Sequence, residues 1–386
     1  MEKEITNLLK KLIEINSVYP NELILAKFIE QILKKGGYRI TKQAVDKNRF
    51  NILVEKGLGK ESILLYSHLD TVGIVDGWKT NPLKLTVKTN RAYGLGSWDM
   101  KGGMAMNIIA FLNSQPKNLK LKMALCVDEE NISKGGHKLM NSDFMKDVVC
   151  TISTEPSFFY GNNGIVIGRP GRAVFTVQIS GRPNHYALYD KNIDINIFVS
   201  EFIQKLSIEY KKSANKKQFL FIRKISSETV GVSTPNKIYL EIDSSIIPPK
   251  TSDQVKTGIE NITKKINQKY EQYFTISVDY FKRETPFLES YEIKKDNLYL
   301  GLLKKSILKT TRKKAVPYFR SSVADENIFG SHGNTVLSIG PIGANAHAPN
   351  EWVSLSSLEK LYNIINDFLV RVDKSYDLGR PRGNKT

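Results

Sequence analysis

The sequence is poor in cysteine: its 386 residues contain two, far fewer than a disulfide framework needs. Cys126 and Cys150 both lie in apolar segments, so we expect them to be reduced core residues. No apolar run approaches the roughly 18–20 residues that span a bilayer. Segment 1–16 alternates charged residues with Leu and Ile, unlike a signal peptide. These absences predict a cytoplasmic protein without a membrane partner.

Acidic residues are outnumbered by basic ones, 39 to 57, which gives a formal net charge of +18. A charge of this size suggests nucleic-acid binding, for which the lysine-rich segments 211–217 and 304–314 would be candidate sites. Neither segment is accompanied by a recognised nucleic-acid motif or by residues that stack on bases. We therefore expect the charge to lie on solvated faces, where it helps to attract anionic substrates, and we expect no nucleic-acid partner.

The length favours at least two domains over a single core. Two amphipathic helices are predicted at 1–16 and 21–35, and a glycine-led apolar helix at 102–114. The predicted strands are rich in apolar residues and occupy segments 50–57, 62–72, 119–130 and 148–157. Strands that alternate with helices predict an α/β fold with a mostly parallel central sheet and helices on both of its faces.

A different pattern begins near residue 172. Strand and helix signals follow in the order β-α-β-β-α-β up to about residue 284, which is the order of a split-βαβ domain. The chain then returns to the first domain, and Ser356 and Glu359 form the capping box of a predicted terminal helix. We therefore predict a catalytic domain in two segments, 1–171 and 285–386, interrupted by an inserted α+β lid domain at 172–284.

Imidazoles and carboxylates are concentrated in five short segments. The residues are His68, Asp70, Asp99, Glu129, Glu130, Glu155 and His347. His68, the pair Glu129–Glu130 and Glu155 each stand at or just beyond the end of a predicted strand, where ligands of parallel sheets gather. Two imidazoles and several carboxylates can hold a pair of divalent cations and leave one carboxylate as a base. The pattern favours a hydrolase over a passive binding module.

Each of these residues also has a structural interpretation when it is taken alone. These interpretations are a hydrogen-bonded core histidine for His68, a helix N-cap for Asp99, exposed strand-end acids for Glu129 and Glu130, and an exposed loop histidine for His347. Alternation along the strand places Asp70 on the same side as His68. There its carboxylate can accept the second N–H of a metal-bound imidazole. We expect His137 and His332 to be surface or structural residues.

The segments HLDTV, GSWDMKGG, VDEE, STEPS and AHAPNEWV occur in this order along the chain. Together they resemble the dinuclear zinc aminoacylase and carboxypeptidase family, which includes acetylornithine deacetylase, succinyl-diaminopimelate desuccinylase, glutamate carboxypeptidase and related dipeptidases. The likeness covers nearly the whole chain. The intervals of 31 residues from His68 to Asp99 and 30 from Asp99 to Glu129 are also typical of the family. The resemblance implies a zinc-exopeptidase-like fold with a lid domain.

The resemblance also implies two divalent metal ions, expected to be zinc, with cobalt or manganese as alternatives. Asp99 would bridge both ions, His68 and Glu155 would complete one site, and Glu130 and His347 would complete the other. Three ligating carboxylates and a hydroxide then offset the four charges of two zinc ions. That balance leaves Glu129 outside the ligand set.

Further roles follow from the same resemblance. Glu129 would be the general base, Asp70 would support His68, and His185 in the lid segment SGRPNHYALYD would stabilise the oxyanion. In some members of the family this histidine acts across a dimer interface. A cis peptide bond is expected between Asp99 and Met100.

Substrate recognition departs from the family pattern. The family often has Asp-x-Arg-x-x-Pro after a substrate-binding Asn, but here Ser245 stands where the Arg would be, although Asn236 is present. Arg320 is a candidate to bind a substrate carboxylate instead. The predicted function is hydrolysis of the amide bond of an N-acyl amino acid. A dipeptidase or carboxypeptidase is the alternative, and a non-catalytic binding protein on the same scaffold is a third. The expected partners are the small substrate and a second copy of the chain, bound through the lid.

Overall fold

The computed structural model describes residues 1–213, 219–229 and 231–377. Part of the lysine-rich segment 211–217 and the end of the predicted segment 285–386 lie outside the described residues. The chain divides into two compact units. Unit 1 comprises Met1–Gly168, Glu292–Arg320 and Ala324–Thr386, and unit 2 comprises Arg169–Tyr291 and Ser321–Val323. The inserted segment thus forms a compact unit of its own, which also includes the short segment Ser321–Val323 from later in the chain.

A mixed sheet forms the centre of unit 1. Its strands are, in spatial order, β1 (Ile40–Asp46), β2 (Arg49–Lys56), β6 (Lys120–Cys126), β3 (Ser62–His68), β7 (Val148–Ser153), β15 (Thr335–Ser338), β8 (Gly164–Arg169) and β13 (Tyr291–Glu292), with β14 (Val316–Phe319) paired to β8. The four strands from β6 to β15 run parallel to one another. At one edge, β2 pairs antiparallel with β6, and β1 pairs antiparallel with β2. All seven residues of β3 are buried, as expected for a strand that is covered on both faces.

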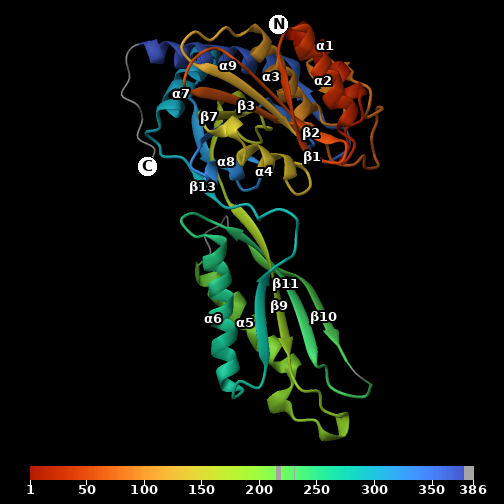
Figure 1. Cartoon of the computed structure of the whole chain (residues 1–386). Coiled ribbons are helices and arrows are strands. Elements are labelled where there is room, and N and C mark those ends of the chain that lie inside the picture. Colours follow the sequence, from red (N-terminus) through yellow and green to blue (C-terminus); the bar gives the residue numbers. More distant parts are fainter. Residues whose placement is uncertain (214–218, 230, 378–386) are drawn as a thin grey trace. The chain divides into compact units, whose positions relative to one another are not determined.

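Helices cover both faces of this sheet, as the sequence predicts. The helices of unit 1 are α1 (Glu2–Glu14), α2 (Leu23–Lys35), α3 (Gly102–Asn113), α4 (Lys134–Met140), α7 (Leu298–Thr311), α8 (Glu326–Ser331) and α9 (Leu355–Asp377). Figure 1 shows α3, α7 and α9 on one side of the sheet and α4 and α8 on the other. Helix α3 is buried over almost its whole length because it is apolar on every face. No helix in the described ranges is long and apolar enough to cross a membrane.

The register of the parallel strands brings their carboxyl ends to one edge. His68, the last residue of β3, pairs with Cys126, the last residue of β6. Tyr66 of β3 pairs with Ser153, the last residue of β7, which in turn pairs with Ser338 of β15. The loops that follow these strands therefore begin side by side. This alignment positions the candidate site.

A second, small sheet in unit 1 is not predicted by the sequence pattern. It consists of β16 (Gly343–Ala344), β17 (Trp352–Ser354), β5 (Arg91–Tyr93) and β4 (Thr86–Lys88), in that order. Trp352 pairs with Tyr93 and Ser354 with Arg91. Because its strands come from distant parts of the chain, the sheet holds the loop after β16 beside the loop that follows β5.

The start of α9 differs from the prediction. The helix begins at Leu355, and the Ser354 hydroxyl accepts a hydrogen bond from the backbone N–H of Ser357 at 3.2 Å. The predicted box at Ser356 and Glu359 is therefore wrong by two residues. Ser354, Ser356 and Ser357 can each act as an N-cap, although only Ser356 is followed by Glu three residues later, and β17, which ends at Ser354, decides which of them caps the helix.

Unit 2 is an antiparallel sheet with two helices on one face. Its main elements are β9 (Gly171–Ser180), α5 (Ile195–Ser213), β10 (Leu220–Glu228), β11 (Lys237–Ile246), α6 (Ser252–Lys269) and β12 (Thr275–Tyr280). The sheet order is β10-β11-β9-β12. Thr251 and Gln254 form a capping box at the start of α6. The element order along the chain is the β-α-β-β-α-β expected from the sequence.

Short elements complete the structure. They are η1 (Ser97–Lys101), η2 (Asp143–Met145), η3 (Gly161–Asn163), η4 (Tyr186–Leu188), η5 (Lys191–Ile193) and β13 (Tyr291–Glu292). Of these, η1 matters for the site because it contains Asp99.

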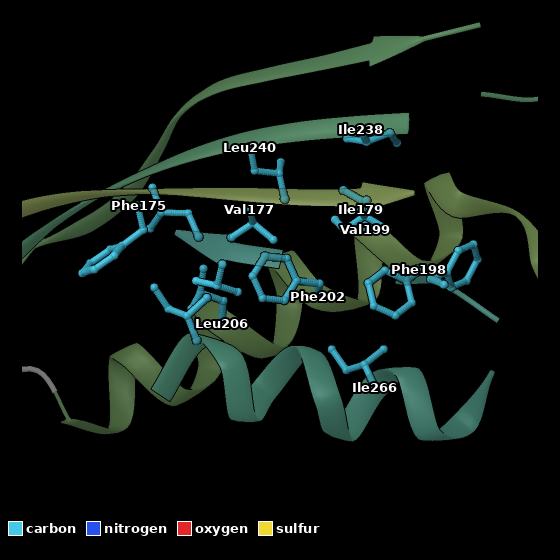
Figure 2. Close-up of a cluster of buried hydrophobic side chains, with 14 of the residues drawn as sticks. Phe175, Val177, Ile179, Phe198, Val199, Phe202, Leu206, Ile238, Leu240 and Ile266 are labelled. Carbon is cyan, nitrogen blue, oxygen red and sulfur yellow. The ribbon is translucent and has the colours of Figure 1, made fainter. Parts of the chain in front are cut away.

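A buried hydrophobic cluster holds unit 2 together. Figure 2 shows Phe198 and Phe202 of α5 packed against Val177 and Ile179 of β9, with Ile266 of α6 on the opposite side. Phe202 is fully buried in this cluster. The alternation of apolar residues along β9 and β11 supplies one wall, and the two helices supply the other.

We expect Phe202→Ala to destabilise unit 2 by about 3–5 kcal/mol, because it removes a large buried side chain and leaves a cavity. Trp78, Trp98 and Trp352, the three tryptophans of the chain, all belong to unit 1. Denaturant unfolding followed by far-UV circular dichroism should therefore show an earlier transition, while the transition in tryptophan fluorescence stays in place. Ile208→Ala on the same helix is the control, since Ile208 is 49% exposed. Equal effects of the two substitutions would contradict the assignment of this core.

Candidate metal centre

The loops at the carboxyl edge of the sheet carry most of the predicted site residues. His68 ends β3, Glu129 and Glu130 follow β6, and Glu155 follows β7. Two further residues come from outside the sheet. Asp99 lies in η1 just before α3, and His347 lies in the loop between β16 and β17. All of these residues belong to unit 1.

Their side chains converge. The His68 Nε2 atom lies 3.4 Å from Asp99 Oδ1 and 3.4 Å from Glu155 Oε1. The His347 Nε2 atom lies 3.4 Å from Asp99 Oδ2 and 3.0 Å from Glu130 Oε1. The two oxygens of Asp99 thus face two different imidazoles, each of which has a second carboxylate beside it. Such an arrangement can hold two cations on either side of one shared carboxylate.

Among the described residues, three groups of side chains have ligand atoms within 4.8 Å of one another. They are His68 with Asp99 and Glu155, His68 with Glu129 and Glu130, and Asp99 with Glu130 and His347. The first and third groups have the same composition as the two ligand sets that the sequence predicts. The second adds Glu129, so the geometry by itself leaves two roles open for this residue: ligand, or base beside the ligands.

Asp70 contacts both neighbouring strand ends. Its carboxylate accepts hydrogen bonds from the backbone N–H groups of Glu129 at 3.2 Å and Glu130 at 2.9 Å. The Nδ1 atom of His68 lies 3.0 Å from the Asp70 carbonyl oxygen and 3.6 Å from its carboxylate. The side chain that was predicted to support His68 therefore also fixes the backbone of the two glutamates. Its position links β3 to the loop after β6.

Burial makes the charges of the acids costly. It raises the pKa of Glu129 well above its ordinary value and raises the pKa of Glu155 as well. Burial also raises the pKa of Glu130 to about 7, although the hydrogen bond with His347 opposes the shift. The acids of the cluster are therefore poor anions unless positive charge is placed beside them.

The pKa values of the two imidazoles are also raised, but by their carboxylate neighbours and not by burial. Hydrogen bonds with Asp99 and Glu130 raise the pKa of His347 to about 10. Burial by itself would lower the pKa of His68, but Asp70, Asp99 and Glu155 together raise it well above the ordinary value. Burial would raise the pKa of Asp99, yet its contacts with His347 and His68 lower it. In metal-free protein, protons on the two imidazoles thus supply the positive charge that the acids require.

The donor set fits divalent cations. The Oε1 atom of Glu155 is enclosed and forms no hydrogen bond with a described residue, and its ion-pair partner, His68 Nε2, lies 3.4 Å away. Carboxylate oxygens and imidazole nitrogens are the ligands that zinc and similar ions take in hydrolytic sites. The cluster therefore has the composition, burial and unsatisfied acceptor that such ions would need.

Two glycines allow the backbone to close around Glu155. A Cβ atom at Gly103 would lie 2.4 Å from the Thr154 carbonyl oxygen, and one at Gly340 would lie 1.8 Å from the Glu155 carbonyl oxygen. Both distances are far below a van der Waals contact. The glycines of the segments DMKGG and SIGPIG thus permit α3 and the loop after β15 to approach the end of β7.

Glu351 is a buried residue at the site to which the sequence pattern assigned no role. Its carboxylate accepts hydrogen bonds from the backbone N–H groups of Gly96, Trp98 and Asp99. Burial raises the pKa of Glu351 to about 8, although these hydrogen bonds oppose the shift. The sequence signal was present, because Glu351 closes the segment NAHAPNE that contains His347.

The expected cis peptide between Asp99 and Met100 is confirmed.

Arg320, predicted to bind a substrate carboxylate, belongs to unit 1 and is buried. Its Nη1 atom donates to the Pro156 carbonyl oxygen at 3.0 Å, and its guanidinium lies 4.2 Å from the centre of the Phe158 ring. It therefore stands beside the segment that follows Glu155.

The remaining predicted residues, His185 and Asn236, belong to unit 2. His185 is exposed, and its Nδ1 atom accepts a hydrogen bond from the backbone N–H of Ala187 at 3.3 Å. The Asn236 backbone bonds to Gly181 and Glu228. These contacts all lie within unit 2, and the substrate-binding and oxyanion roles of the two residues stay predictions. His332, expected to be structural, contacts the carbonyl oxygen of Ile328 at the end of α8.

Comparison with known proteins places this site in a family. The model of peptidase family M20/M25/M40 matches residues 64–371, which include every residue of the cluster. The chain belongs to this family. The resemblance drawn from the sequence is thereby confirmed, as is the assignment to the metal-dependent hydrolases.

Individual relatives of this M20/M25/M40 member match over their full length. A succinyl-diaminopimelate desuccinylase of Sulfurovum sp. (strain NBC37-1) is 25% identical over 377 residues, which cover 94% of this chain and 97% of the relative. A tripeptidase from Staphylococcus aureus shares 16% identity, with a TM-score of 0.76 over 97% of this chain and 99% of that one. A dinuclear metal-binding peptidase of the M20 family from Bacillus subtilis shares 14%, with a TM-score of 0.75 over 97% and 98%. The structural matches confirm the fold.

We expect the protein to bind divalent cations and to gain stability from them, since positive charge beside the buried acids lowers the free-energy cost of ionising them. A cation at a hundredfold excess over its Kd should stabilise the protein by about 2.7 kcal/mol. The melting temperature with Zn²⁺ or Co²⁺ should thus exceed that of chelator-treated protein, and His347→Ala should bind one ion fewer. His332→Ala is the matched control. A melting temperature that is indifferent to added metal would contradict this assignment.

Proposed function

We propose that this M20/M25/M40 peptidase is a deacylase that hydrolyses the amide bond of an N-acyl amino acid with the help of two divalent metal ions. The observation that carries the proposal is the position of Asp99, whose two carboxylate oxygens each face a different imidazole. A single shared carboxylate between two half-sites is the arrangement that a pair of ions requires. Zinc is the proposed ion, with cobalt or manganese as alternatives.

The ligands are assigned from the two half-sites. Asp99 would bridge the ions, His68 and Glu155 would hold one of them, and Glu130 and His347 would hold the other. When bound, such ions lower the pKa of water and polarise an amide carbonyl. Asp70 keeps the backbone of the 129–130 segment in place through its two hydrogen bonds.

Glu129 acts as the general base in this proposal. It is next in sequence to the ligand Glu130, its side chain lies within the same cluster, and burial raises its pKa, which makes its carboxylate a stronger base. It takes a proton from the attacking water and passes it to the leaving amine. The products are a carboxylate and a free amine.

A deacylase is favoured over a peptidase by the match to the Sulfurovum desuccinylase, which spans nearly all of both chains. A di- or tripeptidase is the second candidate, because the Staphylococcus aureus tripeptidase has the same fold. Both classes present an amide to the metals, and both have substrates with a carboxylate. Arg320 and Asn236 are the proposed contacts for the substrate, Arg320 because it places a positive charge beside the segment after Glu155.

Unit 2 is proposed to be a lid that also joins two copies of the chain. Its edge strand β10 is nine residues long and presents Phe221 and Ile225, which are 50% and 56% exposed. An open strand edge with apolar side chains is a template for pairing with a second chain. His185 would stabilise the oxyanion of the tetrahedral intermediate. It lies in an exposed segment with Tyr186 and Leu188, which are 68% and 75% exposed.

The substrate class is tested with a panel of N-succinyl and N-acetyl amino acids against di- and tripeptides, in the presence of Zn²⁺ or Co²⁺. We expect metal-dependent hydrolysis of the N-acyl amino acids. Glu129→Gln should keep the bound metal and lower kcat by roughly 10²- to 10⁴-fold, the range for loss of a general base. Faster turnover of peptides would favour the second candidate, and metal-loaded protein that hydrolyses no amide in the panel would refute the proposal.

The role of His185 is tested by complementation. His185→Ala and Glu129→Gln should each be nearly inactive alone. If His185 serves the neighbouring subunit, a heterodimer of the two variants has one intact site, so an equal mixture should recover roughly a quarter of wild-type activity after subunit exchange. Should His185 act within its own chain, the mixture stays inactive. Full activity of His185→Ala alone would remove the role.

A further inference from the structure

A carboxylate outside the ligand set joins the two loops that present Asp99 and His347. The Oε1 atom of Glu351 accepts hydrogen bonds from Trp98 N at 2.7 Å and Asp99 N at 2.9 Å. Its Oε2 atom accepts one from Gly96 N at 2.7 Å. The side chain is 2% exposed, so these backbone groups replace water as its hydrogen-bond donors.

Glu351 is also tied closely to His347. It follows His347 by four residues in the loop between β16 and β17, and its carbonyl oxygen accepts a hydrogen bond from Gly94 N at 3.1 Å. The next residue, Trp352, pairs with Tyr93 of β5. Glu351 therefore forms hydrogen bonds to the start of η1 through its side chain and to the residue after β5 through its backbone.

We propose that Glu351 is a positioning residue that sets the separation of Asp99 and His347, and through it the affinity of the half-site formed by Asp99, Glu130 and His347. The inference rests on the proposed function, in that it takes these residues to hold a metal ion. His347 needs such a tie because its imidazole is half-exposed and belongs to a loop rather than to the central sheet.

The chemistry of the contact requires a carboxylate. Three N–H groups converge on its two oxygens, so both oxygens must act as acceptors, and such hydrogen bonds are strongest when the carboxylate is ionised. An amide at this position would turn one acceptor into an NH₂ donor that faces another donor. Both oxygens of Glu351 are thus engaged by the backbone, and Glu351 is absent from the three groups of ligand atoms found among the described residues.

The chain offers a matched control in Asp373 of α9. The Oδ1 atom of Asp373 also accepts hydrogen bonds from three consecutive backbone N–H groups, those of Lys117, Asn118 and Leu119. That loop leads into β6 and contains none of the proposed ligands. Asp373→Asn therefore makes the same carboxylate-to-amide change at a side chain that also holds backbone N–H groups of unit 1, without touching the loops at the cluster.

The test is the affinity for Zn²⁺ of metal-free wild-type protein, Glu351→Gln and Asp373→Asn, measured by competition with a chelator. We expect Glu351→Gln to lower the affinity of one of two ions by roughly 10- to 100-fold, the usual effect of losing a group that orients a ligand. Asp373→Asn should bind both ions as the wild type does, even where its melting temperature falls. The visible absorption spectrum of Co²⁺-loaded Glu351→Gln should also change, because the ligand geometry at one ion is altered.

Glu351→Asp keeps the carboxylate and shortens the side chain by one methylene. It replaces Glu351→Gln in this test if Glu351→Gln does not fold. We expect it to weaken the same ion by a smaller factor. Folded variants at position 351 that bind two Zn²⁺ ions with wild-type affinity would overturn the inference while leaving the proposed function intact. Wild-type protein that binds no divalent cation would overturn both.

Discussion

Buried acids need buried positive charge, and the structure of unit 1 depends on this constraint at the carboxyl edge of its sheet. Asp70, Asp99, Glu129, Glu130 and Glu155 meet there with His68 and His347. Burial raises the pKa of Glu129, Glu130 and Glu155, and positive charge on the imidazoles or on cations between the acids offsets the cost of ionising them. The enclosed Oε1 atom of Glu155 forms no hydrogen bond with the described residues and lies 3.4 Å from His68 Nε2.

Two sheets of unit 1 bring these side chains together. The parallel register of β3, β6 and β7 aligns three loops that bring acids and an imidazole to one place. The small sheet of β16, β17, β5 and β4 then brings the loops of Asp99 and His347 to the same place from the other side. Two further carboxylates, Asp70 and Glu351, accept hydrogen bonds from the backbone of these loops and fix their shape.

Much of this could be predicted from the sequence. Apolar strands alternating with helices predicted the mostly parallel sheet, and the change to a β-α-β-β-α-β order predicted the inserted unit, because hydrophobic periodicity is a local property. The cluster itself could be predicted because its residues stand at strand ends and in short motifs. The capping box predicted at Ser356 is wrong, because Ser354, where the pairing of β17 ends, caps the helix although no Glu or Gln stands three residues after it.

What the sequence by itself determined is the set of reactive side chains and the elements that carry them. Both follow from residue type and spacing over a few neighbours. Only the tertiary structure decided that Glu351 fastens the loop of Asp99 and that Asp70 holds the backbone of Glu129 and Glu130. These contacts join residues 252 and 59 positions apart. No local pattern encodes which distant N–H group a buried carboxylate will meet, because strand register and loop closure fix that choice.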